Sequence, residues 1–150
     1  MLQTGIPAPD FELPDSHGNM VKLSDFKGQK VVLYFYSKDN TAGCTKQAQG
    51  YAELYSDFTA KNTVVIGISK DSTASHEKFA AKYELPFILL SDTEKKVIGT
   101  YDVWKEKKLY GKTSMGVVPT TYLIDENGII TEAFGKVKAA DDPPKMLSLV

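Results

Sequence analysis

The sequence contains no arginine, so all 18 of its cationic residues are lysines. Cysteine is almost as scarce, because Cys44 is the only one in the 150 residues. A single thiol excludes an internal disulfide, and it excludes a metal cluster held by several thiolates of this chain alone. It also fits a compartment that keeps thiols reduced. Chemistry that needs a guanidinium or a second thiol must therefore draw on another molecule.

Long apolar runs are missing as well. No stretch approaches the roughly 20 residues of a membrane span, and the first residues, MLQTG, lack the charged and apolar regions of a signal peptide. We therefore expect a cytoplasmic protein. The net charge of −1 provides no basic surface of the kind that binds nucleic acid. Hydrophobic residues make up 42% and charged residues 25%, which is typical of one globular domain over residues 1–150.

What the chain does contain is organised around residues 31–58. An apolar run over residues 30–36 predicts a strand that is buried on both faces. A polar turn over residues 37–43 follows, and then a helical pattern whose first residue is Cys44. The apolar positions of this helix recur at helical spacing and are Ala48, Tyr51, Tyr55 and Phe58. A buried strand thus delivers one thiol to the start of a helix.

The rest of the chain alternates strand and helix patterns between two predicted hairpins. The first hairpin covers residues 11–23, and the second joins 120–124 to 129–134 through an Asn-Gly pair. Between them the patterns predict strands over 63–69 and 86–90, helices over 74–84 and 93–101, and a loop over 102–115. Asp142 is the expected N-cap of a last helix. This order predicts an α/β fold in which helices cover both faces of a mixed central sheet with an antiparallel edge.

The position of Cys44 suggests a reactive thiol. Only a thiolate is nucleophilic, and the free N–H groups and partial positive charge of a helix N-terminus favour that form. The hydroxyl of Thr41 can reach the same loop, Asn40 can brace it, and Gly43 allows a close approach of the backbone to a small ligand. The alternative is that Cys44 is a small buried hydrophobe, as many unpaired cysteines are. Placement alone leaves both open.

The stretch YFYSKDNTAGCT, residues 34–45, resembles the active-site signature of peroxiredoxins of the bacterioferritin-comigratory-protein type, the PrxQ group. The signature of that group is proline, three residues, threonine, two residues and cysteine. Five further stretches resemble the group in its order, namely PAPDF (7–11), LSDFKG (23–28), GISKD (67–71), LSD (90–92) and YLIDENG (122–128). The resemblance covers nearly the whole chain and implies a thioredoxin-like fold with an N-terminal β-hairpin extension.

The resemblance also implies a chemistry without metal or cofactor. Cys44 would be the peroxidatic cysteine, whose thiolate attacks a peroxide oxygen and becomes a sulfenic acid. The Thr41 hydroxyl and the Cys44 backbone N–H would contact the peroxide. Ser37, Asn40, Gly43 and Pro119 would line the pocket.

Three positions depart from the family pattern. Ser37 replaces the signature proline that shields the thiolate, and Gln49 stands where many members carry a resolving cysteine. Pro119 stands where the family places an arginine. A lysine such as Lys38 or Lys112 offers only a point charge and does not replace the planar, two-pronged set of donors of a guanidinium. We therefore expect a one-cysteine enzyme, monomeric or homodimeric, that is reduced by thioredoxin, by a glutaredoxin system or by glutathione.

Residues 117–121, VVPTT, resemble the cis-proline segment of thioredoxins, so we expect a cis Val118–Pro119 bond. The alternative is a trans proline that opens an edge strand. His17 and His76 are both expected at the surface, and residues 105–108 are expected as an exposed charged loop.

Three functions follow from these residues, in order of preference. The first is a one-cysteine thiol peroxidase that reduces hydrogen peroxide or alkyl hydroperoxides. The second is a thiol–disulfide partner or redox-sensing module that uses Cys44 and Pro119. The third is a non-enzymatic scaffold.

Overall fold

The computed structural model describes residues 1–150, apart from the side chain of Leu109. Its elements are β1 (Glu12–Pro14), β2 (Met20–Lys22), the 3-10 turn η1 (Leu23–Phe26), β3 (Lys30–Phe35), α1 (Ala42–Glu53), α2 (Tyr55–Ala60), β4 (Thr63–Ser69), α3 (Thr73–Tyr83), β5 (Ile88–Ser91), α4 (Lys96–Thr100), β6 (Trp104–Leu109), β7 (Lys112–Val117), β8 (Thr120–Ile124), β9 (Ile130–Gly135) and α5 (Asp142–Leu149).

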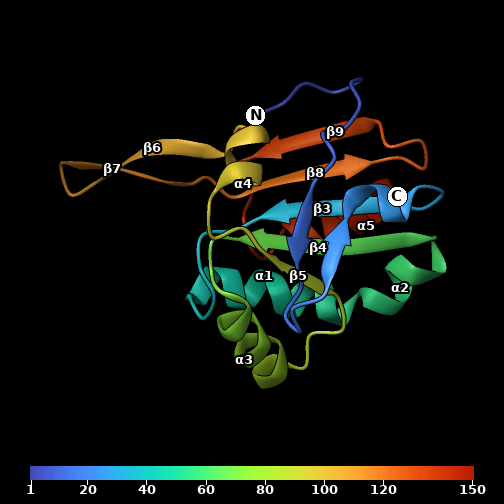
Figure 1. Ribbon diagram of the computed structural model, residues 1–150, viewed down its shortest axis with the longest axis horizontal. Coiled ribbons are helices and arrows are strands. Elements are labelled where there is room, and N and C mark those ends of the chain that lie inside the picture. Colours follow the sequence, from blue (N-terminus) through green and yellow to red (C-terminus); the bar gives the residue numbers. More distant parts are fainter.

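A five-stranded mixed sheet forms the centre of the molecule (Figure 1). Its strand order is β5-β4-β3-β8-β9, in which β3 pairs in parallel with β4 and antiparallel with β8. The strands β8 and β9 form the antiparallel edge, joined by the hairpin that the Asn-Gly pair predicted. The predicted α/β class and mixed sheet are therefore confirmed.

The central strand β3 is buried on both faces, as its continuous apolar run predicted. Alternate side chains of a strand point to opposite faces. Val31, Leu33 and Phe35 accordingly belong to one core cluster, and Val32 and Tyr34 belong to the other. This strand is therefore a rigid base for the turn that follows it.

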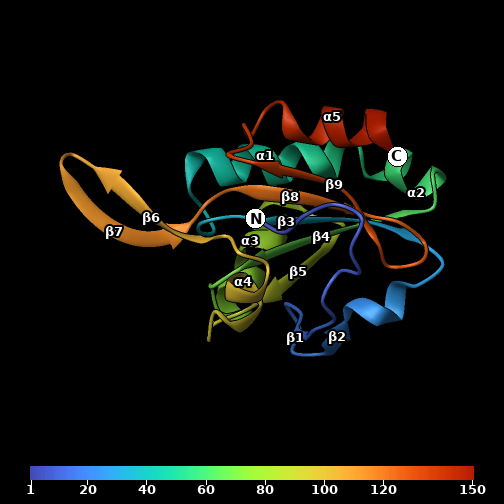
Figure 2. The ribbon, with the colours of Figure 1, turned by 90° about the horizontal axis from the view of Figure 1, so that it is seen from above.

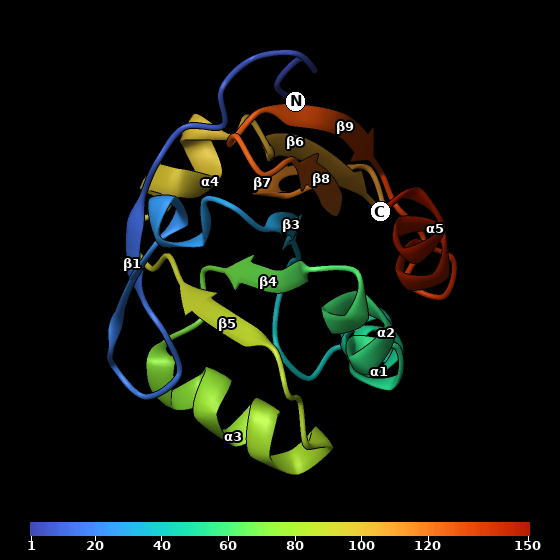
Figure 3. The same ribbon diagram turned by 90° about the vertical axis from the view of Figure 1, so that its right-hand side faces the viewer.

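Each face of the sheet has its own cover (Figure 3). The first cluster is closed by the N-terminal hairpin, η1 and α4, which contribute Leu13, Leu23, Val97 and Ile98. The second cluster is closed by α1, α2, α3 and α5, which contribute Ala48, Tyr51, Phe58, Phe79 and Met146. None of the described helices is both long and apolar enough to cross a membrane.

The contact between α1 and α5 depends on a glycine. A Cβ atom at Gly50 would lie 2.8 Å from Cγ of Pro143, which is closer than real contacts allow. Glycine at this position lets the two helices approach each other. This approach places the buried start of α5 next to the helix that carries Cys44.

The predicted loop over 102–115 is wrong, because these residues form the antiparallel hairpin β6–β7. Six residue pairs join its strands, from Trp104 opposite Val117 to Leu109 opposite Lys112. The hairpin projects from the body of the molecule (Figures 1 and 2). Much of it is exposed to solvent, so its sequence lacks the apolar alternation of a half-buried strand. The one local feature that indicates a hairpin is the two-residue turn Tyr110-Gly111. Both residues have positive φ angles, 52° and 77°.

Several helix boundaries also differ from the prediction. The helix expected from Cys44 begins two residues earlier, at Ala42, and Leu54 separates α1 from α2. The helix expected over 93–101 is the shorter α4. Asp141, rather than Asp142, occupies the N-cap of α5. Asp142 is instead drawn into the core by the hydrogen bonds described below.

Candidate active site at the start of α1

Cys44 is the third residue of α1, and Thr41 is the N-cap of this helix. The backbone N–H of Cys44 is therefore among the first four of the helix, which have no acceptor within it. The side chain is partly buried and packs against the second core cluster. A small reagent can therefore reach the thiol of Cys44, while packing against the core fixes the position of its side chain.

The turn between β3 and α1 takes its sharp bend at Asn40. Asn40 has a φ of 62°, in the left-handed region that asparagine tolerates better than most residues. Gly43 lies within the helix, and a Cβ atom there would meet nothing within 4 Å. The turn itself therefore does not depend on Gly43. The Thr41 hydroxyl donates a hydrogen bond to the carbonyl oxygen of Lys38, at 3.0 Å, and thereby closes the turn.

Ser37 and Pro119 lie where β3 and β8 begin to separate. The Ser37 hydroxyl is 3.5 Å from the carbonyl oxygen of Val117, which is a weak hydrogen bond. Because Phe35 is opposite Thr120, Pro119 follows in register beside Tyr36. The expected cis Val118–Pro119 bond is wrong, since the described chain contains no cis peptide bond. Pro119 opens β8 as a trans proline, and its carbonyl oxygen accepts a bond from the Val137 N–H.

Lys107 of β6 is close enough to Cys44 for the charges of the two side chains to interact. This lysine is partly buried, and its side chain folds across the hairpin, so that a Cβ atom at Gly116 would lie 3.1 Å from its Cδ. Burial and then repulsion from Lys70 lower the pKa of Lys107, whereas the negative charge of Cys44 raises it. The sequence had assigned this lysine to an exposed loop, because nothing in residues 102–115 indicated which side chains turn inward.

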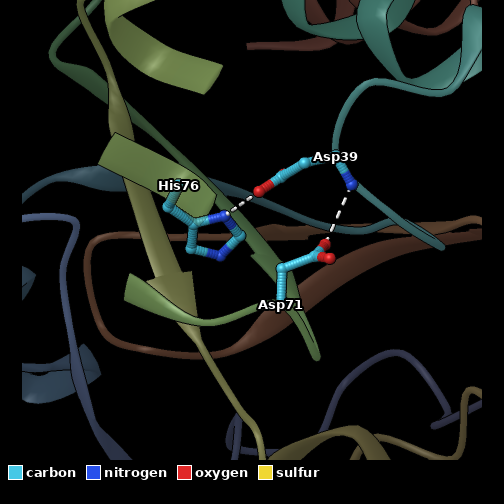
Figure 4. A group of neighbouring side chains, drawn as sticks. All are labelled: Asp39, Asp71 and His76. Carbon is cyan, nitrogen blue, oxygen red and sulfur yellow. Dashed lines mark hydrogen bonds and ion pairs between the residues drawn. The ribbon is translucent and has the colours of Figure 1, made fainter. Parts of the chain in front are cut away.

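The turn before α1 is anchored through Asp39, which is buried and makes several hydrogen bonds. Its carboxylate accepts hydrogen bonds from the Tyr36 hydroxyl at 2.7 Å and from the Ser75 hydroxyl at 2.8 Å. It also lies 2.7 Å from Nδ1 of His76 (Figure 4). The Asp39 backbone N–H donates to the carboxylate of Asp71, at 2.9 Å.

These contacts decide the charge of Asp39. Burial by itself raises the pKa of the Asp39 carboxyl. The hydrogen bond and charge of His76, together with the hydrogen bonds from Tyr36 and Ser75, outweigh burial and hold that pKa below its usual value of 3.8. Asp39 is therefore an anion at neutral pH.

The expectation of a surface position for His76 is wrong, because its ring is 0% exposed. The residue stands on α3 three, four and seven positions before Phe79, Ala80 and Tyr83, which pack against the second core cluster. This spacing puts His76 on the buried face of the helix. The spacing was visible in the sequence and was missed because histidine was treated as polar.

The ligand atoms of Asp39, Asp71 and His76 lie within 4.8 Å of one another, a grouping that a metal ion can use. These atoms already bond to one another and to neighbouring hydroxyl and N–H groups. An ion would have to break the bond between Asp39 and His76. The cluster is therefore better described as a hydrogen-bonded anchor.

A second buried carboxylate, that of Asp142, binds side chains of α1. Oδ2 of Asp142 accepts hydrogen bonds from the Gln47 amide at 2.9 Å, from the Tyr51 hydroxyl at 2.6 Å and from the Thr121 hydroxyl at 2.8 Å. Tyr34 stacks on Tyr51, with ring centroids 4.8 Å apart. Burial, followed by the charges of Cys44 and Asp142, raises the pKa of Tyr34 well above 10.0, so its phenol stays neutral.

Comparison with known proteins shows which family the sequence matches. Residues 4–133 match the AhpC/TSA family. Peroxiredoxin Bcp of Bacillus subtilis is 46% identical over 140 residues, which cover 93% of this chain and 89% of the relative. A putative peroxiredoxin bcp of Coxiella burnetii is 47% identical over 137 residues, which cover 91% of each chain.

Solved structures agree with these sequence relatives. The bacterioferritin comigratory protein of Xanthomonas campestris superposes with a TM-score of 0.91 at 32% identity, over 98% of this chain and 96% of the other. A mutant of Xylella fastidiosa PrxQ gives a TM-score of 0.94 at 33% identity, over 99% and 95%. The yeast mitochondrial 1-Cys peroxiredoxin gives 0.84 at 22% identity, over 99% and 75%, and at that identity it supports the fold alone.

Proposed function

The chain belongs to the AhpC/TSA family and is a thiol-dependent peroxidase with the thioredoxin-like fold of the Bcp/PrxQ peroxiredoxins, and on this premise we propose that it works with Cys44 as its one reactive thiol. The observation that carries the proposal is the place of Cys44, in the first turn of α1, beside Thr41 and near the charge of Lys107. Its substrates are peroxides, and its electrons come from an external thiol.

In the proposed reaction the Cys44 thiolate attacks the terminal oxygen of hydrogen peroxide or an alkyl hydroperoxide. A sulfur–oxygen bond forms as the oxygen–oxygen bond breaks, and the departing oxygen takes up a proton and leaves as water or an alcohol. The backbone N–H of Cys44 and the hydroxyl of Thr41 donate to the peroxide oxygens as negative charge moves onto them. Alkyl hydroperoxides are supported as substrates because the similar Xanthomonas campestris protein reduces alkyl peroxides.

The sulfenic acid of Cys44 is then reduced by two external thiols. The first thiol condenses with it, releases water and leaves a mixed disulfide. The second thiol displaces Cys44 and leaves as part of an external disulfide. Gln49, exposed on α1, occupies the position at which many relatives carry a resolving cysteine. Thioredoxin, a glutaredoxin system and glutathione are the proposed reductants, in a cytoplasm that keeps Cys44 reduced. Neither a monomer nor a homodimer conflicts with this route.

We expect Cys44 in the purified protein to be oxidised by hydrogen peroxide or cumene hydroperoxide faster than free cysteine at the same pH. The reason is that the site stabilises both the thiolate and the departing oxygen. Stopped-flow rates with intact-mass detection of one added oxygen measure this step. Recycling is then followed by adding thioredoxin with its reductase, glutaredoxin with glutathione, or glutathione alone.

A rate equal to that of free cysteine would overturn the peroxidase mechanism proposed for Cys44. Rapid oxidation with no turnover under any of the three reductants would overturn the proposed reduction route and retain the first step. Selective formation of a mixed disulfide with thioredoxin, without peroxide turnover, would point to a thiol–disulfide partner in place of a peroxidase.

Lys107 is proposed as the cation that supports the thiolate in a chain without arginine. Lys107→Gln is expected to slow the alkylation of Cys44 by iodoacetamide and its oxidation by peroxide several-fold at pH 7, and less so at high salt. Alkylation rates at several ionic strengths provide the measurement. Lys108→Gln is the matched control, because Lys108 is the next residue of β6 and is exposed. Equal rates for the two variants would contradict this role.

A further inference from the structure

The ring of His76 lies between Asp39 and β5. Nδ1 lies 2.7 Å from the Asp39 carboxylate, and Nε2 lies 3.0 Å from the carbonyl oxygen of Leu90. The hydroxyls of Tyr36 and Ser69 are farther away, at 3.4 Å from Nδ1 and 3.5 Å from Nε2. The side chains of His76 and Asp39 are 0% and 1% exposed, so water does not compete for these contacts.

Other polar groups surround this pair. Tyr36, the residue after β3, also faces the ring, and burial, as the largest cause, raises the pKa of Tyr36 well above 10.0, so that it stays a neutral donor. Asp71 lies close to the ring but binds elsewhere, accepting from the Ser69 hydroxyl at 2.6 Å and from the Asp39 N–H. The pair is thus enclosed by Tyr36, which follows β3, and by groups from β4, β5 and α3.

The pair connects the turn before α1 to α3 and β5. Asp39 is two residues before Thr41 and five before Cys44. His76 belongs to α3, and its second bond reaches β5. The Asp39–His76 contact therefore ties the turn that leads into α1 to a helix and a strand on the other side of β4 (Figures 3 and 4).

We propose that the hydrogen-bonded pair Asp39–His76 is a positioning element for the peroxidase reaction, which holds Thr41 and the first turn of α1 where a bound peroxide needs them. The inference rests on the function proposed above. Neither residue touches the peroxide. Both act through the turn, whose backbone leaves Asp39, bends at Asn40 and enters the helix at Thr41. Misplacing a reacting group by about 1 Å can cost about a hundredfold in rate.

Two substitutions of His76 distinguish the roles of its two ring nitrogens. The amide nitrogen of asparagine replaces Nδ1, so His76→Asn keeps a neutral donor for Asp39. The amide nitrogen of glutamine replaces Nε2, so His76→Gln keeps the bond to Leu90 and abandons Asp39. We expect His76→Gln to oxidise with peroxide about tenfold or more slowly than the natural protein, and His76→Asn to retain the larger share of the rate. His17→Gln, at the other and exposed histidine, is the control and is expected to change nothing.

A second reagent distinguishes positioning from a general structural role. Iodoacetamide needs the Cys44 thiolate but makes no use of the Thr41 contact. We expect the His76 variants to be alkylated at a nearly unchanged rate while their peroxide rate falls. Equal losses with both reagents, or a His76→Gln rate equal to that of the natural protein, would overturn the proposal. A natural protein no faster than free cysteine would overturn this inference and the proposed function together.

Two further measurements keep the inference testable if His76→Gln does not fold. Ser75→Ala removes one hydrogen bond to Asp39 from a partly exposed position, and a smaller, peroxide-specific loss of several-fold is expected. Nitrogen-15 NMR is expected to show a proton on Nδ1 of His76, the ring nitrogen that faces Asp39. An Nδ1 without a proton, or a Ser75→Ala protein as fast as the natural one, would contradict the positioning role of the pair.

Discussion

Thr41→Val is expected to lower the rate constant for peroxide oxidation of Cys44 on the order of 10²-fold, the usual loss when one donor to a developing oxyanion is removed. Threonine and valine have nearly the same shape, and both are β-branched, so the N-cap backbone of α1 is retained. The Thr41 hydroxyl now donates to the carbonyl oxygen of Lys38. A hydroxyl can rotate, and we expect it to turn towards the peroxide when one enters. Stopped-flow oxidation under excess peroxide measures the loss.

Thr41→Ser is the matched control, because serine keeps the hydroxyl and a favourable N-cap. It is expected to stay within a few-fold of the natural rate. The melting temperatures of the two variants show whether the loop itself has changed. If Thr41→Val reacts as fast as Thr41→Ser, the hydroxyl of Thr41 is not a peroxide ligand.

Asp142→Ala is expected to destabilise the fold by about 3 kcal/mol or more, because it leaves three buried donors without their acceptor and each such loss costs roughly 1–3 kcal/mol. These donors belong to Gln47 and Tyr51 on α1 and to Thr121 on β8, so one carboxylate joins two helices to the sheet. A loss of this size is a large part of the roughly 5–15 kcal/mol that stabilises a typical domain. Urea unfolding followed by circular dichroism measures it.

The neighbouring residue provides the control for Asp142. Asp141 is exposed, and its side chain makes no capping hydrogen bond at the start of α5. Asp141→Ala should change the free energy of unfolding by no more than about 0.5 kcal/mol. Similar losses in the two variants would show that the hydrogen bonds of Asp142 do not stabilise the packing of α1, α5 and β8.

The sequence predicted those parts of the fold where the local pattern of apolar and polar residues matches the burial of the side chains. The run at β3 is apolar throughout because both of its faces are covered, and the Asn127-Gly128 pair turns the β8–β9 hairpin with a φ of 81° at the glycine. The sequence also placed Thr41 and Cys44 together at the start of a helix, because they are only three residues apart. These features depend on residues that are near neighbours in the chain.

The features that were missed depend on partners far away in the chain. Asp39 and His76 are 37 residues apart, and Gln47 and Asp142 are 95 apart, so their pairing becomes visible only in three dimensions. Pro119 was expected to be cis because of a local resemblance. Its surroundings, in which the Val137 N–H binds its carbonyl oxygen, belong to the connection between β9 and α5.

The β6–β7 hairpin has a consequence for how the protein behaves at high concentration. A strand pair that stands clear of the body offers free backbone groups along its edges, and such edges invite other chains to add strands and form fibrils. This hairpin carries Lys105, Lys107, Lys108 and Lys112 along its strands. Lysines on an exposed edge oppose that addition by charge repulsion. The charged composition that concealed the hairpin in the sequence therefore also opposes the addition of further strands to its edges.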